Sequence, residues 1–343
     1  MEAFSVRNSS CKVNDSRNES SETEYEETFF PWPLTVILSF MCLLISAVNG
    51  LVIILIHKKK TLRTPTNMFL TSLATSDLLS GLVGIPLALI CLTSFTRDFL
   101  IVCVLSTIFI RFTAISSVCN VLLIACDHHI FIIHQMRYHS LVSSRRGVAA
   151  IVAVWLIAFA ASTIQMSWHS FDEETLTTID EETESIDIKY SLACIAFFFA
   201  FPLILMCYIY GNIFYISFKR HQTDRKLNKD LRQRFRPQRH EWRGRSVLLI
   251  TLIIFAGCWS PYFLTVLDEH TESIDFQLPL WVQRLLVFLN FVPAMLNPIL
   301  CTLAKKDFRK ALKEVVLRRE SSYLSDANVN VHAASQRIAK KRG

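Results

Sequence analysis

Charge is scarce in this sequence, and that scarcity excludes an ordinary soluble protein. Only 19% of the 343 residues are charged, whereas 52% are hydrophobic. This is far more apolar than a soluble domain needs. Seven long blocks are almost free of charge, and only Asp77 and Arg111 lie well inside them. We therefore expect a membrane protein.

The sequence also lacks the features of most membrane enzymes and transporters. Most of the ten histidines lie between the blocks or at their ends, so no His/Asp/Glu or Ser/His cluster is available for a hydrolase or a zinc enzyme. No internal repeat is present, although repeats with several buried charges are typical of transporters. We expect no enzymatic activity, and a seven-span transporter is the weaker alternative.

The seven apolar blocks predict seven spanning helices. Each has about 20 to 27 residues, enough to cross a hydrocarbon core of roughly 30 Å at about 1.5 Å per residue. Helices are expected because each span must satisfy its own backbone hydrogen bonds in lipid. The result is an all-α fold, a seven-transmembrane helix bundle occupying residues 34–304. The blocks are 34–56, 67–93, 100–126, 147–168, 190–216, 246–267 and 279–304.

The segments between the blocks alternate in charge. Most of the 36 Lys and Arg lie in 57–66, 127–146, 217–245 and after 304, and most of the 29 Asp and Glu lie in the other segments. Basic residues beside spans stay in the cytoplasm. We therefore expect a multi-pass protein with its N-terminus outside.

Residues 1–33 are predicted to form an extracellular tail. They lack the basic, apolar and small-residue sections of a cleavable signal peptide, so the first span is expected to act as the targeting signal. Three Asn-x-Ser sequons begin at Asn8, Asn14 and Asn18 and predict glycosylation. The alternative for each is an unused asparagine.

The third block ends in a polar signature that resembles a known family. Asp127, His128 and His129 follow the apolar run directly, and Gln135 and Tyr138 come shortly after. Their register is similar to the end of the third helix and the second inner loop of rhodopsin-like (class A) G-protein-coupled receptors. That family has Asp-Arg-Tyr where this chain has Asp-His-His, and Pro where it has Gln135.

Other blocks extend this resemblance over residues 34–317. Residues 62–67, at the start of the second span, are similar to amine and adenosine receptors, and the sixth and seventh spans carry Cys-Trp-Ser-Pro and Asn-Pro-Ile-Leu-Cys motifs. The resemblance implies a plasma-membrane receptor that converts binding of an extracellular ligand into heterotrimeric G-protein activation. Arrestin and a receptor kinase would be further partners. A non-signalling decoy or scaffold receptor is the alternative that His128 and Cys301 allow.

By the same resemblance, Asp77, Ser117 and Asn297, with Asn49 nearby, would hold an allosteric sodium ion. Oxygen ligands suit such a hard cation. Pro293 stands where many members have another Asn. The alternative for Asp77 is a hydrogen-bonded anchor between helices that keeps a proton. No other cofactor is expected.

The resemblance also implies an activation switch, with Trp259 and Phe255 carrying the change toward the G protein. His128 replaces the family's Arg, so its ion pair with Asp127 and Glu241 would hold only while the imidazole is protonated. A weakened lock and raised basal signalling are the hypothesis, and a neutral, packed His128 is the alternative. The switch residues are Val118, Asp127, His128, Pro202, Tyr210, Glu241, Phe255, Trp259, Pro261, Asn297, Pro298 and Cys301.

The sequence says less about the chemical identity of the ligand than about the fold. Ile110 replaces the Asp of amine receptors, which argues against their usual ammonium mode. Phe291 stands where opsins have the lysine that binds retinal, which argues against an opsin. Arg111 would meet an anionic group or snorkel to the interface. The acidic outer loops would steer a cationic peptide or amine, or simply be solvated. Predicted ligand contacts are Ile110, Arg111, Cys194, Trp259, Tyr262, Phe263, Asn290 and Phe291.

Cys103 lies where the family forms a disulfide to the second outer loop. That loop, residues 169–189, contains no cysteine. The other outer candidates are Cys91 and Cys11, so a bridge such as Cys103 to Cys11 and a free Cys103 both stay open.

A basic amphipathic helix is expected at 305–317, on the inner membrane surface, with Phe308 as its anchor. The cytoplasmic tail follows at 318–343. We assign its charges, and those of the inner loops, to topology, lipid attraction and a cytosolic partner. No nucleic-acid partner is expected.

Overall fold

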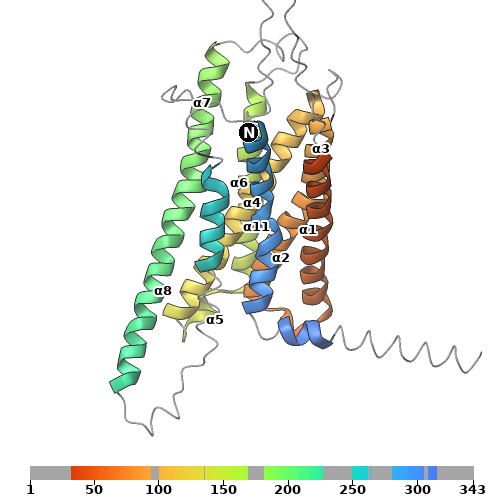
Figure 1. Cartoon of the computed structure of the whole chain (residues 1–343). Coiled ribbons are helices and arrows are strands. Elements are labelled where there is room, and N and C mark those ends of the chain that lie inside the picture. Colours follow the sequence, from red (N-terminus) through yellow and green to blue (C-terminus); the bar gives the residue numbers. More distant parts are fainter. Residues whose placement is uncertain are drawn as a thin grey trace, which may run out of the picture.

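A computed structural model describes most of the chain and confirms the all-α prediction. The described residues are 32–93, 100–134, 136–168, 181–226, 249–261, 263, 280–304 and 308–314. Within them every regular element is helical, and the long helices run alongside one another as a bundle (Figure 1).

Seven helical stretches correspond to the seven predicted spans. Five are long and apolar enough to cross a membrane: Pro33–Lys58, Pro65–Cys91, Ile101–Ile133, Ser144–Ser167 and Ser185–Lys219. The sixth and seventh spans contain the shorter apolar helices Leu249–Pro261 and Phe288–Leu300. The chain is therefore a seven-helix membrane bundle.

The helices are named as in Figure 1. The first span is α1 (Trp32–Lys58), and the second comprises α2 (Pro65–Leu79), the turn Ser80–Gly84 and α3 (Ile85–Thr93). The third is α4 (Leu100–Ile133), followed by the short α5 (Tyr138–Leu141) and the fourth, α6 (Ser144–Thr163) with the turn Ile164–Ser167. The fifth comprises α7 (Glu181–Ile195), the turn Ala196–Ala200 and α8 (Phe201–Lys226), and the seventh is α11 (Leu280–Ala304).

Two helices run further than their apolar blocks predicted. The third continues beyond residue 126 to Ile133, and the fifth extends from Glu181 to Lys226 rather than from 190 to 216. Apolarity reports only the part of a helix that lies in lipid, whereas backbone hydrogen bonds can carry the helix into water. Block ends were therefore poor predictors of helix ends.

Two π-helical turns interrupt the second and fifth spans. Ser80–Gly84 precedes Pro86, and Ala196–Ala200 precedes Pro202. Proline lacks an N–H and disrupts the hydrogen bond to the residue four positions earlier, so a local widening absorbs the mismatch. The first turn follows Asp77 closely and affects how the side chains beyond it face the bundle.

The core lies between the helices and the periphery is apolar. Helix α4 contacts α2, α3, α6 and α8, and α1 contacts α2 and α11. Large apolar side chains such as Leu43, Leu156 and Phe197 remain more than half exposed, as expected of lipid-facing positions. Trp155 joins the fourth span to the second, because its indole N–H donates to Ser72 Oγ at 3.0 Å.

A short helix at 308–314 lies across the end of the bundle (Figure 1). Phe308 is only 1% exposed, and Ala311 is also buried. Lys59, just after α1, forms an ion pair with Glu314 of this helix. These contacts attach the short helix to the first span.

Candidate functional site

Asp77 joins three helices near the middle of the bundle. Its side chain is 1% exposed. Ser117 of α4 donates to Oδ1 at 2.9 Å, and the amide of Asn297 in α11 donates to Oδ2 at 3.1 Å. The structure thus brings together three of the four residues predicted for sodium.

Asn49, the fourth of these residues, holds two helices together. Its amide donates to the carbonyls of Ile45 and Ala294, each at 3.0 Å. The second bond ties α1 to α11. Its side-chain oxygen is buried and has no hydrogen-bond partner among the described residues, so the placement of Asn49 near the sodium ligands stays a prediction.

A small cavity of about 30 Å³ adjoins Asp77. One water needs roughly 10–15 Å³ measured in this way, so the space suits one or two waters or a partly hydrated ion. Ser80, Thr113 and Asn290 add oxygen atoms to its lining. Asn290 Oδ1 is buried and has no hydrogen-bond partner among the described residues. The cavity therefore offers several oxygen ligands to a small cation.

The same cavity joins predicted ligand contacts to predicted switch residues. Of the predicted ligand contacts, Ile110 and Phe291 line the cavity. Of the predicted switch residues, Val118, Phe255 and Trp259 line it. A ligand that repacks the first group would therefore disturb the second.

Aromatic rings stack beside this cavity. Trp259 stacks on Phe263 with ring centroids 5.8 Å apart, and Phe255 lies 6.5 Å from Trp259. Phe199 contacts both Phe255, at 5.8 Å, and Phe263, at 4.5 Å. The sequence named Pro202 among the switch residues of the fifth span. Pro202 is buried, but the ring contact comes from Phe199, which the sequence reasoning missed.

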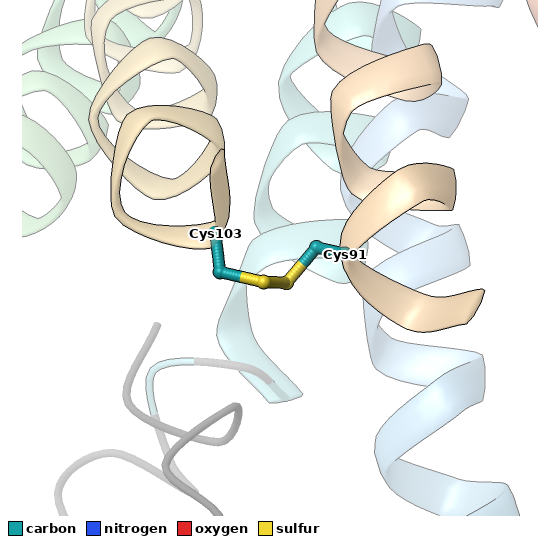
Figure 2. Close-up of a disulfide and its surroundings, with 2 residues drawn as sticks. All are labelled: Cys91 and Cys103. Atoms are coloured by element: carbon teal, nitrogen blue, oxygen red, sulfur yellow. A yellow bond between two sulfur atoms is a disulfide. The ribbon is translucent and has the colours of Figure 1, made fainter. Parts of the chain in front are cut away.

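A disulfide closes one end of the bundle. Cys91, near the end of α3, is bonded to Cys103 at the start of α4, with Cα atoms 5.1 Å apart (Figure 2). This corrects the two readings that named a Cys11 bridge or a free Cys103. Because the bridge closes a loop with a sequence separation of only 12, it acts between neighbouring spans.

Arg111 belongs to a polar network between three spans. Its guanidinium donates to Gln165 and to the hydroxyl of Tyr190 at 2.9 Å. Its central carbon also lies 4.9 Å from the Tyr190 ring centroid, a cation–π geometry. Arg111 does not line the cavity. These contacts account for Arg111 without a ligand anion.

Asp187 completes this network from α7. It is 5% exposed, and its Oδ1 accepts from Gln165 Nε2 at 3.0 Å and from the Trp168 indole at 2.8 Å. The sequence counted Asp187 among the acids of an outer loop. The structure places it in a helix, because the fifth helix begins earlier than its apolar block.

The opposite end of the bundle centres on Asp127. Its carboxylate is 4% exposed and accepts a hydrogen bond from the Tyr138 hydroxyl at 2.7 Å. Thr66 Oγ1 lies 3.0 Å from the same hydroxyl, and Phe131 packs edge-on against the Tyr138 ring. Tyr138 therefore links the third span, the following loop and the start of α2.

His128 points to a different partner. Its Nδ1 lies 2.8 Å from the carbonyl of Ile124, one turn earlier in α4. The predicted lock pairs this imidazole with Asp127 and Glu241, and because Glu241 lies outside the described residues the lock stays a prediction. In this conformation Tyr138, rather than His128, holds the Asp127 carboxylate.

The remaining predicted residues are only partly described. Tyr210 and Pro298 are buried, Pro261 and Cys194 are half-buried, and Cys301 lies in α11. Glu241, Tyr262 and the sequons at Asn8, Asn14 and Asn18 lie outside the described residues. Those roles stay predictions.

The family follows from this fold and from a direct match. Residues 48–300 match the family described as 7 transmembrane receptor (rhodopsin family). The chain belongs to this family and is a G-protein-coupled receptor rather than an enzyme. It is a multi-pass membrane protein whose class responds to an extracellular ligand and acts on a G protein.

Several curated receptors are similar over most of their length. Melatonin receptor type 1A of Mus musculus is 24% identical over 272 residues, which covers 78% of this chain and 76% of that receptor. Histamine H2 receptor of Cavia porcellus is 28% identical over 322 residues, covering 91% and 85%. Adenosine receptor A2b of Homo sapiens is 28% identical over 288 residues, covering 79% and 85%.

Proposed function

We propose that this receptor lies in the plasma membrane with its N-terminus outside and its Asp127 end in the cytoplasm. Lys58, Lys60 and Arg145 lie exposed near the Asp127 end, as expected of cytoplasmic segments. The Cys91–Cys103 disulfide lies at the other end of the same spans. Disulfides persist in an oxidising exterior, so charge and redox chemistry support the same orientation.

The cavity beside Asp77 is the observation that carries the signalling proposal. It is lined by Ile110, Asn290 and Phe291 from the predicted ligand site, and by Phe255 and Trp259 from the predicted switch. A ligand that favours one packing of these residues shifts the population of receptor states. The outcome would be activation of a heterotrimeric G protein at the Asp127 end.

The ligand we propose is a small molecule. The similar receptors carry the names of melatonin, histamine and adenosine, all of them small molecules. Ile110 supplies no counter-charge for an ammonium, and Arg111 is engaged by Gln165 and Tyr190. A ligand recognised through aromatic and amide contacts fits these residues better than an obligate cation.

We also propose that a sodium ion binds at Asp77 and modulates the receptor. A fully buried carboxylate needs a cation, a proton or strong hydrogen bonds, and the cavity supplies oxygen ligands from Ser117 and Asn290. Replacing NaCl by choline chloride should lower the unfolding temperature of the purified receptor, and Asp77→Asn should remove the difference. An unchanged sodium response in that variant would place the ion elsewhere or exclude it.

Basal second-messenger output tests the signalling proposal. Cyclic AMP and calcium would be measured in cells that express the wild type, His128→Arg or Trp259→Ala at matched surface levels. We expect wild-type output above that of empty-vector cells and a reduced output for Trp259→Ala. A silent wild type with an active His128→Arg variant would instead indicate a decoy receptor.

Arrestin and a receptor kinase are proposed as further partners, by analogy with the family. Ligand-dependent recruitment of a labelled arrestin in the same cells would test this, once an activating ligand has been identified by the second-messenger assay.

A further inference from the structure

The fifth span is held to its neighbours by polar and ring contacts at the disulfide end of the bundle. Among the described residues, the covalent bridge joins only the second and third spans. The Tyr190 hydroxyl of the fifth span accepts from Arg111 of α4 at 2.9 Å and donates to the carbonyl of Ala161 in α6. The Trp168 indole packs on the Tyr190 ring, with centroids 5.6 Å apart. These contacts fix α7 against two other helices.

Gln165 is oriented by two opposite charges within this junction. Its Oε1 accepts from the Arg111 guanidinium, and its Nε2 donates to the buried Asp187 carboxylate at 3.0 Å. An amide turned the other way would present a donor to the cation and an acceptor to the anion. Only one orientation satisfies both neighbours. A single amide therefore sets how α4 and α7 approach each other at this level.

The π-helical turn Ala196–Ala200 follows this junction in the fifth span. It begins where α7 ends at Ile195, and it also contacts α4. Phe199 lies in this turn, and a helix rises about 13 Å from Tyr190 to that position. A π-helical turn accommodates one extra residue, so the direction of its side chains depends on how the preceding helix is held. Movement of α7 would therefore re-aim Phe199.

Phe199 is the ring through which the fifth span meets the sixth. Its centroid lies 5.8 Å from that of Phe255 and 4.5 Å from that of Phe263. Trp259 stacks on Phe263 in turn. Gln165 does not line the cavity beside Asp77. The junction therefore reaches the switch rings by a route other than that cavity.

We propose that Gln165 is a positioning residue of the switch, because it holds α7 so that Phe199 keeps its ring contacts with the sixth span. Asp187 acts with it by holding the amide in its one favourable orientation. The effect passes through Phe199 and not through contact with a ligand. The positioning role stands on the packing alone, whereas its consequence for signalling rests on the function proposed above.

Fluorine NMR of the purified full-length receptor tests this inference at the ring itself. 4-Fluorophenylalanine would replace Phe199, and its chemical shift would report the environment of the ring. Gln165→Met keeps the length of the side chain and removes both hydrogen bonds. We expect the resonance to move by more than its line width or to split into two. Lys189→Ala, at an exposed position of α7, is the matched control and should leave the resonance in place.

A milder variant keeps the test decisive if Gln165→Met does not fold. Trp168→Phe retains an aromatic ring beside Tyr190 and removes the N–H that donates to Asp187 at 2.8 Å. We expect a smaller movement of the fluorine resonance in the same direction. An unmoved resonance in either variant, once its unfolding temperature shows a folded protein, would overturn the inference. An equal movement in Lys189→Ala would also overturn it.

Basal second-messenger output at matched surface levels tests the consequence for signalling. Gln165→Met should lower the output by about two- to fivefold, as expected of a coupling residue outside the ligand site, and Phe199→Leu should lower it too. The double variant should match Phe199→Leu alone, since Gln165 acts through that ring. Losses that multiply would contradict this order of action. A silent wild type with a moved fluorine resonance would refute the proposed signalling function and leave the positioning role intact.

Discussion

Tyr138 is the residue on which the Asp127 end depends most directly. Its hydroxyl bonds to Asp127 and contacts Thr66, and its ring packs on Phe131. Burial, supported by the nearby Asp127 carboxylate and opposed by the Thr66 hydrogen bond, raises the pKa of Tyr138 to about 12. The hydroxyl therefore stays protonated and donates to Asp127 at physiological pH.

Removing this hydroxyl should destabilise the receptor. Tyr138→Phe leaves the buried Asp127 carboxylate without its donor, which we expect to cost about 1–3 kcal/mol in the free energy of unfolding. Thermal unfolding of the purified protein measures this loss. Ser140→Ala, which changes an exposed residue of the same loop, is the control and should have little effect.

The pKa shift also predicts a dependence on alkaline pH. A pKa raised from 10.0 to about 12 in the folded state gives stability that is fully present below pH 10 and is lost between pH 10 and 12. The difference in unfolding temperature between the wild type and Tyr138→Phe should shrink across this window. A difference that stays constant there would show that the phenol does not titrate with this shift.

Among the elements, the third, fourth and fifth spans are joined by the Arg111–Gln165–Asp187 network. Gln165 lies between the two charges, donating to Asp187 and accepting from Arg111. The network ties α4, the end of the fourth span and α7 at the disulfide end. It positions the fifth helix beside the predicted ligand site.

Asp187→Ala should weaken this junction. The Gln165 amide and the Trp168 indole would each lose an acceptor, and we expect a cost of about 1–3 kcal/mol. Lys189→Ala, at an exposed position of the same helix, should change stability by less than about 0.5 kcal/mol. Equal unfolding temperatures for the two variants would mean that the network carries no net stability.

The packing of α1 on the second span allows a matched pair of glycine substitutions. A Cβ at Gly81 would lie 2.8 Å from Ile45 Cγ2, whereas a Cβ at Gly211 would meet nothing within 4 Å. Gly81→Ala should cost about 1–3 kcal/mol through overpacking. Gly211→Ala should be neutral or stabilise by up to about 1 kcal/mol, since alanine favours the helix. Thermal unfolding of both variants checks the sign of each change.

At the scale of the whole molecule, the disulfide end and the Asp127 end are held by different chemistry. A covalent bridge and the Arg111 network fix the first end (Figure 2). Hydrogen bonds of Tyr138 and the Lys59–Glu314 ion pair hold the second. The second end is therefore easier to rearrange, which suits the G-protein activation proposed for it.

The loss of stability on breaking the disulfide should not depend on which of the two cysteines is removed. Cys91→Ser, Cys103→Ser and the double variant should each lose up to about 3 kcal/mol, the order expected for a short closed loop. Surface expression and unfolding temperature would fall equally in all three. Cys207→Ser, a free and exposed cysteine, should behave as the wild type. A defect in Cys103→Ser alone would indicate that Cys103 pairs with another cysteine.

Much of this molecule follows from its sequence. The spans follow from the apolar blocks, because a stretch of that length and apolarity has no stable alternative to a helix in lipid. The proximity of Asp77, Ser117 and Asn297 follows from the family motifs, and the structure confirms their contact.

The tertiary structure alone decided which side chains meet where spans and connecting segments are packed together. It paired Cys103 with Cys91, placed Tyr138 on Asp127, put Phe199 among the switch rings and drew Asp187 into a buried network. Such contacts depend on the rotation, tilt and true ends of each helix. These are set by packing between helices, which a hydropathy pattern in one segment does not encode.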